Sequence, residues 1–307
     1  YVRIRQGCAE FTKTFRYCTT SMRKHICLFA ALFIVASLDP VISQKLISNT
    51  GVTGVSYAGN KINRIYIPPP DEFFKKSSGK GGASITVQPS GFPDNALAAV
   101  EYAVSILEAI LPADTKIIIS ASWEKITSSG VLASTNVTGF AGGWSIDAQY
   151  PLAVYPVALA EKIAGRSLND SLEADISLRI NSSINWYLGT DGNTSAQKYD
   201  LVTVVLHEVC HGLGFFDSMN AQNNIGSFGI GSLPIIYDAF IENLQGKRLT
   251  DSLEFPNYSN ELFRELTGGD LYFNGPLLKT YTSGSRAAVW APAVWDPGSS
   301  ISHLDEN

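Results

Sequence analysis

The segment HEVCHGLGFFD, residues 207–217, constrains this chain more than any other part of its sequence. It contains the pattern HExxH, in which the two histidines are four positions apart. Residues with that spacing lie on one face of a helix, so His207 and His211 can direct two imidazoles at one metal ion. Glu208 follows the first histidine and can take a proton from a metal-bound water. The pattern therefore predicts the core of a zinc hydrolase.

The residues around the motif favour a buried helix. The sequence DLVTVVLHEVCHGLGFF, residues 200–216, is apolar on nearly all sides of the predicted helix, which is typical of a helix inside a protein. Asp200 can cap its start, and Gly212 and Gly214 can end it, the latter by adopting a left-handed turn. The alternative interpretation is a buried helix whose two histidines bind no metal.

The small number of histidines narrows the choice of a third ligand. The chain has four of them: His25, His207, His211 and His303. The first falls in a segment that we expect to be removed, and the other three match the number of protein ligands that a catalytic zinc needs when water takes the fourth position. Asp217, three residues after Gly214, is the competing third ligand. We favour His303, with Glu208 as the general base.

Two segments of the chain resemble known zinc peptidases. HExxHxxG, ending at Gly214, resembles the opening of the metzincins, in which this glycine ends the helix and a third ligand follows. PGSSISHLDEN, residues 297–307, looks like the Ser-His element that supplies a late third histidine in leishmanolysin-type enzymes. WYLGTDG, followed by DLVTVVLHEVCHGLGFF, also resembles a group of secreted bacterial metalloproteins. HExxHxxGxxD, ending at Asp217, instead looks like the snapalysin variant.

This resemblance, which covers about residues 85–307, implies a fold and an activity. The implied fold is α+β, a metzincin-like zinc peptidase domain over residues 84–307. Its twisted mixed sheet is backed by a long helix and by the HExxH helix, and residues 218–300 form an insertion that builds the lower subdomain. The implied function is that of a secreted zinc endopeptidase with one catalytic Zn²⁺. Its substrates are proteins or peptides, and water activated by the metal is deprotonated by Glu208.

Other interpretations stay open. The metzincin methionine turn is missing, since Met219 lies too close to the helix to follow a ligand at His303, and Met22 precedes the domain. A thermolysin-like site would need a downstream glutamate as third ligand: Glu242, Glu254, Glu261 or Glu265. From a different class, the chain could be a non-catalytic secreted surface or adhesion module that keeps a zinc site.

The N-terminal residues predict export. Residues 22–43 combine a basic start, a short apolar run and compact residues at the cleavage position, which is the order found in a secretory signal. The apolar run is too short to span a bilayer comfortably, and a permanent anchor is the alternative. Because Tyr1 is not an initiator, we expect residues 1–21 to be an untranslated leader or another non-native extension. We also expect the chain to be a fragment that is incomplete at its C-terminus.

Charge and cysteine content bound the possible partners. Removal of residues 1–43 takes away six basic and two acidic side chains, so 17 basic and 26 acidic residues remain, a net charge of −9. We therefore expect neither nucleic acid nor, after signal removal, a membrane as partner. The one remaining cysteine, Cys210, excludes an intrachain disulfide. We expect its side chain to pack as a small apolar group on the back of the helix.

The rest of the sequence predicts the elements of an α+β domain. Residues 44–83, rich in Gly, Ser, Pro and Lys, form a flexible arm or the remnant of a propeptide, and compact structure is expected from Ala83. A strand at 83–87, a helix at 94–111 and a strand at 116–123 predict a parallel crossover. Residues 175–186 alternate like a strand with one wet face, and we expect them at the sheet edge above the metal, as in metzincin-like folds. Further helices are predicted near 235–243 and 258–266.

Overall fold

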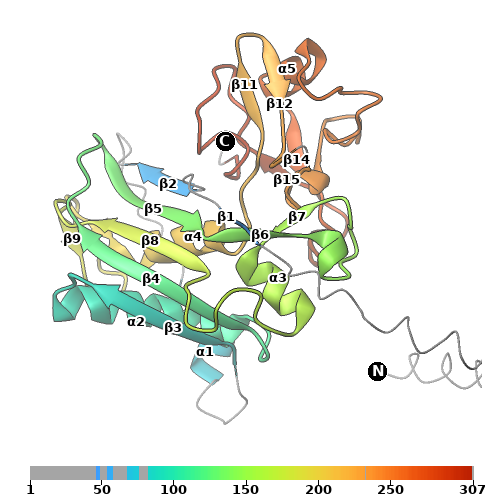
Figure 1. The fold of residues 1–307 in the computed structure, drawn as a ribbon. Helices are drawn as coiled ribbons and strands as arrows, with labels where there is room; N and C mark the ends of the chain where they lie inside the picture. The colour runs from blue at the N-terminus through green and yellow to red at the C-terminus, as the bar shows by residue number, and fades with distance from the viewer. Residues whose placement is uncertain (1–45, 49–53, 58–67, 76–81, 232, 306–307) are drawn as a thin grey trace, which may run out of the picture. The chain divides into compact units, whose positions relative to one another are not determined.

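The computed structural model describes residues 46–48, 54–57, 68–75, 82–231 and 233–305 of the chain. The predicted leader and signal sequence, residues 1–43, lie outside the described residues. No helix in the described part is long and apolar enough to cross a lipid bilayer. The described residues combine helices with a twisted mixed sheet, so the α+β fold class is confirmed (Figure 1).

A mixed sheet of five strands, counted over the described residues, lies at the centre of the fold, in the order β2-β5-β8-β4-β3 (Figure 1). Its strands are β2 (Gly54–Tyr57), β3 (Ser84–Ser90), β4 (Lys116–Glu124), β5 (Val131–Val137) and β8 (Ile176–Asn181). β3, β4 and β8 run parallel to one another. β5 runs antiparallel to β8, and β2 runs antiparallel to β5. The two outer strands of the sheet are therefore β2 and β3.

The strand predicted at residues 175–186 lies inside the sheet, so its expected place at the edge is wrong. β8 is hydrogen-bonded to β4 on one side and to β5 on the other. β5 has no simple alternation of apolar and polar residues because both of its faces are covered: six of its seven residues are buried. β2 then pairs with β5, so folded structure begins before the predicted start at Ala83.

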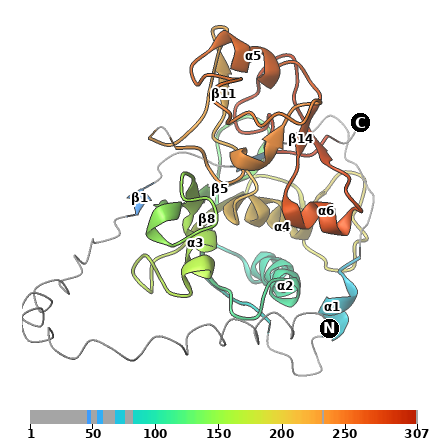
Figure 2. The same cartoon turned by 90° about the vertical axis from the view of Figure 1, so that its right-hand side faces the viewer.

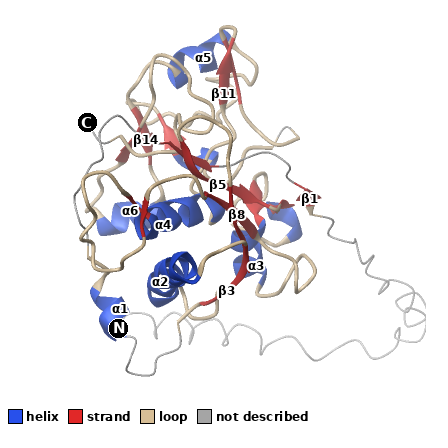
Figure 3. Cartoon of the chain, turned by 90° about the vertical axis from the view of Figure 1, so that its left-hand side faces the viewer, coloured by secondary structure: helices blue, strands red, loops and turns tan. Residues whose placement is uncertain are grey.

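Two helices pack side by side against the sheet (Figures 2 and 3). These are α2 (Asp94–Ile110) and α4 (Leu201–Gly212), and α1 (Asp71–Lys75) contacts α2. α2 connects the parallel strands β3 and β4, as the crossover prediction required. Ile119, Leu178 and Leu201 are fully buried in the core between these helices and the sheet. This core fixes α4, the helix that contains HExxH, against β5 and β8.

Most of the remaining elements surround a second hydrophobic core that includes Phe140, Ile235, Leu262 and Ile301, whereas Trp186 and Tyr199 pack in the first core. Before α4 they are β1 (Ile47–Ser48), β6 (Gly139–Gly142), η2 (Gly143–Ser145), β7 (Val154–Pro156), α3 (Val157–Ala164), β9 (Trp186–Tyr187) and β10 (Tyr199–Asp200). After α4 they are β11 (Asn220–Gln222), β12 (Ile225–Ser227), η3 (Asp238–Phe240), β13 (Ile241–Glu242), α5 (Asn260–Leu266), β14 (Leu271–Phe273), α6 (Pro276–Tyr281) and β15 (Ala287–Val289).

One of the two helices predicted after α4 is present. α5 spans Asn260–Leu266, inside the predicted range of 258–266. The helix predicted near 235–243 is wrong, because that segment contains only the short turn η3 and the strand β13. The carboxylate of Asp238 accepts hydrogen bonds from the amides of Ile235 and Ser218, at 2.9 and 3.0 Å. Such bonds from a side chain to nearby backbone compete with a helix and turn the chain instead.

Candidate metal centre

The helix α4 presents the HExxH residues as the sequence predicted. Asp200 caps its start, because its carboxylate accepts a hydrogen bond from the amide of Thr203 at 2.8 Å. Gly214 follows the end of the helix with a φ of 113°, a backbone conformation that residues other than glycine rarely adopt. Gly212 lies so close to Ile176 of β8 that an added Cβ would come within 2.6 Å of that side chain. The close packing fixes the position of His211, its neighbour.

His303 is positioned by a tightly hydrogen-bonded turn. The amide of Ile301 donates to the carbonyl of Trp290 at 2.7 Å, and the amide of Trp290 donates to the carbonyl of His303 at 2.9 Å. The hydroxyl of Tyr237 donates to the carbonyl of Ile301 at 2.7 Å. Ile301 is fully buried. The turn is therefore part of the folded core.

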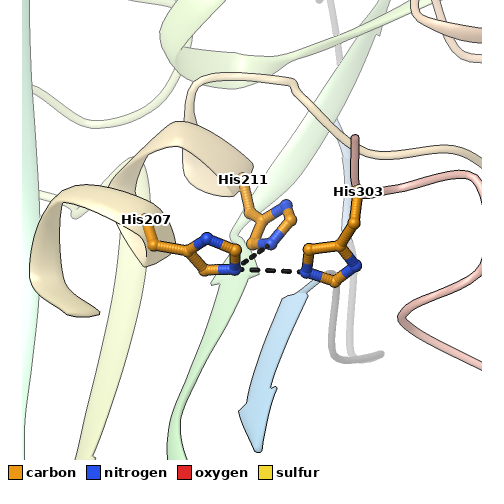
Figure 4. A group of neighbouring side chains, drawn as sticks. All are labelled: His207, His211 and His303. Atoms are coloured by element: carbon orange, nitrogen blue, oxygen red, sulfur yellow. Dashed lines mark hydrogen bonds between the residues drawn. The ribbon is translucent and has the colours of Figure 1, made fainter. Parts of the chain in front are cut away.

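The three imidazoles converge on one point (Figure 4). Nε2 of His207 lies 3.0 Å from Nε2 of His211 and 3.1 Å from Nε2 of His303. One ring nitrogen from each of the three residues lies within 4.8 Å of the others. Zinc–nitrogen bonds of about 2.0–2.1 Å in a tetrahedron place two ligand nitrogens about 3.4 Å apart. The cluster has nearly these dimensions.

The proton positions on the rings also fit a cation. A neutral imidazole has one N–H, and in His211 and His303 it lies on Nδ1, where it donates to the carbonyls of Phe215 at 2.7 Å and Ser299 at 2.8 Å. Their Nε2 atoms therefore direct lone pairs at His207. The single N–H of His207 can satisfy only one of them, whereas a cation at the centre accepts all three lone pairs. Hydrogen bonding of the outer nitrogen to a carbonyl is usual for metal-binding histidines.

Burial keeps two of the rings neutral. It lowers the pKa of His207 to about 3, with further lowering by the neighbouring His211 and His303. Burial likewise lowers the pKa of His211 to about 4, against the opposing effect of its hydrogen bond to Phe215. A metal ion requires the unprotonated form of histidine. At neutral pH His207 and His211 can therefore bind a cation without first losing protons.

Glu208 is completely buried and carries a hydrogen bond on each carboxylate oxygen. Its Oε1 accepts a bond from the hydroxyl of Ser56 on β2, and its Oε2 accepts one from the hydroxyl of Thr135 on β5, at 2.7 Å. Burial raises the pKa of Glu208, although these hydrogen bonds oppose the shift. A buried carboxylate with a raised pKa, next in sequence to a histidine that could bind a metal, suits a general base.

Asp217, the competing third ligand, lies outside the histidine cluster. Its carboxylate accepts hydrogen bonds from the hydroxyl of Ser302 at 2.5 Å and from the amide of Met219 at 2.7 Å. Burial and the neighbouring Asp238 raise the pKa of Asp217, which favours the protonated form that binds no metal. Asp217 thus contacts the residue before His303 and supports the turn that carries this histidine.

The glutamates of a thermolysin-like alternative are engaged elsewhere. Glu242 accepts a hydrogen bond from Arg286 at 3.0 Å, and Glu254 pairs with Lys247 at 2.6 Å. Glu265 accepts one from Asn243 at 3.2 Å. The last candidate, Glu261, is exposed in the first turn of α5. Among the described residues, the group that could hold a metal ion contains histidines alone.

A cavity of about 640 Å³ opens beside the histidines. Its lining is mainly apolar and includes Leu159, Leu213, Phe215, Tyr237, Phe240 and Phe273. Cys210 also lines it and is exposed, so the prediction that this side chain packs on the back of the helix is wrong. Its position follows from helix geometry, because Cys210 is three residues after His207 and shares its side of α4. The spacing within HEVCH was therefore sufficient to predict that Cys210 lies on the same side of the helix as His207.

Two polar residues of the site were not predicted. Thr135 belongs to β5, a strand without a recognisable sequence pattern, and Ser56 belongs to the N-terminal arm. Ser56 is 152 positions from Glu208 in the sequence, and nothing in its local sequence indicates their contact. Only the pairing of β2 with β5 brings it to the site.

Comparison with known proteins gives one match. A family model described as SPBPB7E8-like matches residues 95–242. This range contains His207, Glu208 and His211 and ends before His303. No curated protein and no solved structure matches the chain. The function is therefore inferred from the chemistry of the site itself.

Proposed function

We propose that the chain is a secreted zinc endopeptidase of metzincin-like type, with His207, His211 and His303 as metal ligands and Glu208 as general base. The observation that carries this proposal is the convergence of three imidazoles beside a buried glutamate. Three protein ligands leave one position for water or substrate, which is the arrangement of catalytic zinc sites, whereas structural sites use four protein ligands.

When bound, zinc would supply a Lewis acid that polarises a carbonyl and acidifies a water molecule. Glu208 follows the first ligand directly, so its carboxylate can accept a proton at Oε1 or Oε2 from the attacking water. The same oxygen then returns the proton to the nitrogen of the leaving amine. Thr135 holds Oε2 at 2.7 Å and so fixes the orientation of the carboxylate during this transfer. Asp217 and Tyr237 hold the turn that presents His303.

The cavity beside the histidines supports a peptide substrate with a large apolar side chain. Its volume of about 640 Å³ exceeds that of a single side chain, and Phe215, Phe240 and Phe273 supply aromatic walls. Apolar walls with a few polar groups at one end are typical of pockets that bind organic ligands. We therefore expect cleavage beside apolar or aromatic residues.

A second candidate function is a non-catalytic surface module that keeps a zinc site. Such a module would have no need for a glutamate that is buried beside the ligands and held by two hydroxyls. Burying this carboxylate disfavours its charged form, as its raised pKa indicates. The retained glutamate is therefore better explained by catalysis.

Removal of the metal tests the proposed function. Purified protein is expected to carry about one zinc per chain, measured by elemental analysis. Casein hydrolysis by that protein should fall to background in 1,10-phenanthroline, because the ligand lone pairs alone cannot polarise a carbonyl. Added zinc should restore it, and a non-chelating isomer of phenanthroline is the matched control. Zinc bound at this stoichiometry without hydrolysis of casein or apolar peptides would favour the surface module.

Export is a separate part of the proposal, based on the sequence of residues 22–43. Protein recovered from the culture medium should begin at or after Gln44, which mass spectrometry of its N-terminal peptide would establish. Protein that keeps residues 22–43 and stays in the membrane fraction would show a permanent anchor instead.

A further inference from the structure

The strand β2 lies where it covers the candidate catalytic residue. It pairs antiparallel with β5 at the sheet edge, with Gly54 opposite Thr135 and Ser56 opposite Ala133. Ser56 donates its hydroxyl to Oε1 of Glu208, and its backbone amide also contacts this carboxylate. Since Thr135 holds Oε2, each oxygen of Glu208 already accepts a hydrogen bond, and the residue is fully buried. A general base must exchange protons with water and substrate, so β2 must move before Glu208 can act.

β2 also contacts the metal-binding cluster. The backbone at Gly54 approaches the ring of His211 so closely that an added Cβ would lie 2.4 Å from its Cδ2 atom. In the close view of the cluster, the pale blue ribbon of β2 runs beside the histidines (Figure 4). On the other side, Val55 faces Gly298 in the segment before His303, where an added Cβ would lie 3.9 Å from Cγ2 of Val55. β2 thus lies between β5, α4 and that segment.

The contacts of β2 are those of a bound peptide. An extended peptide commonly binds by adding a strand to an exposed sheet edge, where backbone hydrogen bonds supply affinity for many sequences. β2 is four residues long, its pairing with β5 is irregular between Ser56 and Tyr57, and Tyr57 is half exposed. A strand this short contributes little to the sheet, so it can be displaced without unfolding the domain.

We propose that residues 54–57 act as a tethered inhibitor that occupies the groove for an extended peptide substrate and blocks Glu208 until it is displaced. This inference rests on the proposed peptidase function. It predicts that substrates bind antiparallel to β5 and place a small residue, as Gly54 does, against His211. A segment of the same chain competes at an effective concentration of the order of millimolar, so it can block the groove even if its intrinsic affinity is weak.

The test uses four versions of the full chain: the parent, Gly54→Ala, Ser56→Ala and the control Ser90→Ala, which alters an exposed residue at the opposite edge of the sheet. The first readout is binding of a fluorescein-labelled synthetic peptide, VTGVSYAG (residues 52–59), to metal-free protein, followed by anisotropy. Gly54→Ala expels the tethered strand through its clash with His211, so the peptide should bind at least about tenfold more tightly than to the parent. Ser56→Ala should act in the same direction, and Ser90→Ala should not differ from the parent.

The second readout is casein hydrolysis by the zinc-loaded proteins. Ser56→Ala removes a hydrogen bond to a charged group without adding an atom near His211, so it should raise the rate about tenfold even if Gly54→Ala disturbs the ligand. Equal peptide binding by all four proteins, or slower hydrolysis by Ser56→Ala, would contradict the proposed inhibition. Ser56 would then be a residue that positions Glu208. If peptide binding changes as expected while no version hydrolyses casein, the result would support a peptide-binding site occupied by residues 54–57. It would contradict the proposed peptidase function.

Discussion

Replacement of Glu208 by glutamine is expected to lower the kcat of casein hydrolysis by about 10²–10⁴-fold, the usual contribution of a general acid–base. The amide has nearly the shape of the carboxylate and can still accept a hydrogen bond from Thr135, but it cannot take up a proton. Because Glu208 is not a ligand, the variant should keep its zinc. The measurements are initial rates over a range of casein concentrations and the zinc content of the same samples.

A matched control is Glu101→Gln on α2, an exposed glutamate of the neighbouring helix. It makes the same chemical change outside the site, so its rate should stay within about twofold of the parent. Glu208→Gln with normal zinc content and normal activity would remove Glu208 from the mechanism. Loss of both zinc and activity would indicate that the carboxylate holds the cluster together.

Replacement of His303 by alanine is expected to weaken zinc binding by more than about 100-fold, since changes to residues that only support a ligand already cost about 10–100-fold. Two ligands from one helix remain, and they leave half of a tetrahedral coordination sphere without protein donors. Asp217→Asn should change the zinc affinity by less than about tenfold, because the amide oxygen can still accept the hydrogen bond from Ser302. Competition titration against a chromogenic zinc chelator measures both dissociation constants.

The comparison of these two variants decides between the two candidate third ligands. His303 belongs to the turn, and Asp217 is hydrogen-bonded to that turn through Ser302. Of the two, only His303 directs a possible ligand atom at the other histidines. A large loss of affinity in Asp217→Asn with little change in His303→Ala would transfer the ligand role to Asp217. As a control, Asp305→Asn alters a nearby exposed carboxylate and should leave zinc binding unchanged.

The local parts of the site could be predicted from the sequence because they depend on helix geometry. The spacing of His207 and His211, the cap at Asp200 and the turn at Gly214 all follow from rules that operate within a few residues. His303 was selected by elimination among the histidines and by its Ser-His context, and the structure brings it to within 3.1 Å of His207. Its role as a ligand remains a prediction that the titration above tests.

The non-local parts could not be predicted. The position of β8 inside the sheet depends on β5, whose residues are buried on both faces and so show no period of two. The contact between Ser56 and Glu208, which are 152 positions apart, arises from the pairing of β2 with β5, for which the composition of the arm gives no signal. The segment 235–243 has apolar residues at a helical spacing, but the hydrogen bonds of Asp238 and the pairing of Ile241 with Phe273 override it.

The late position of His303 sets an order in which the site is assembled. During synthesis His211 precedes His303 by ninety-two residues, so the ribosome releases α4 well before the third imidazole exists. The turn must then dock on Tyr237 and Asp217, residues of the segment translated between them. A zinc ion bound there would join this later-made turn to α4 and stabilise the folded arrangement of both. A nascent chain that has not reached residue 303 therefore lacks the third imidazole and the cross-link together.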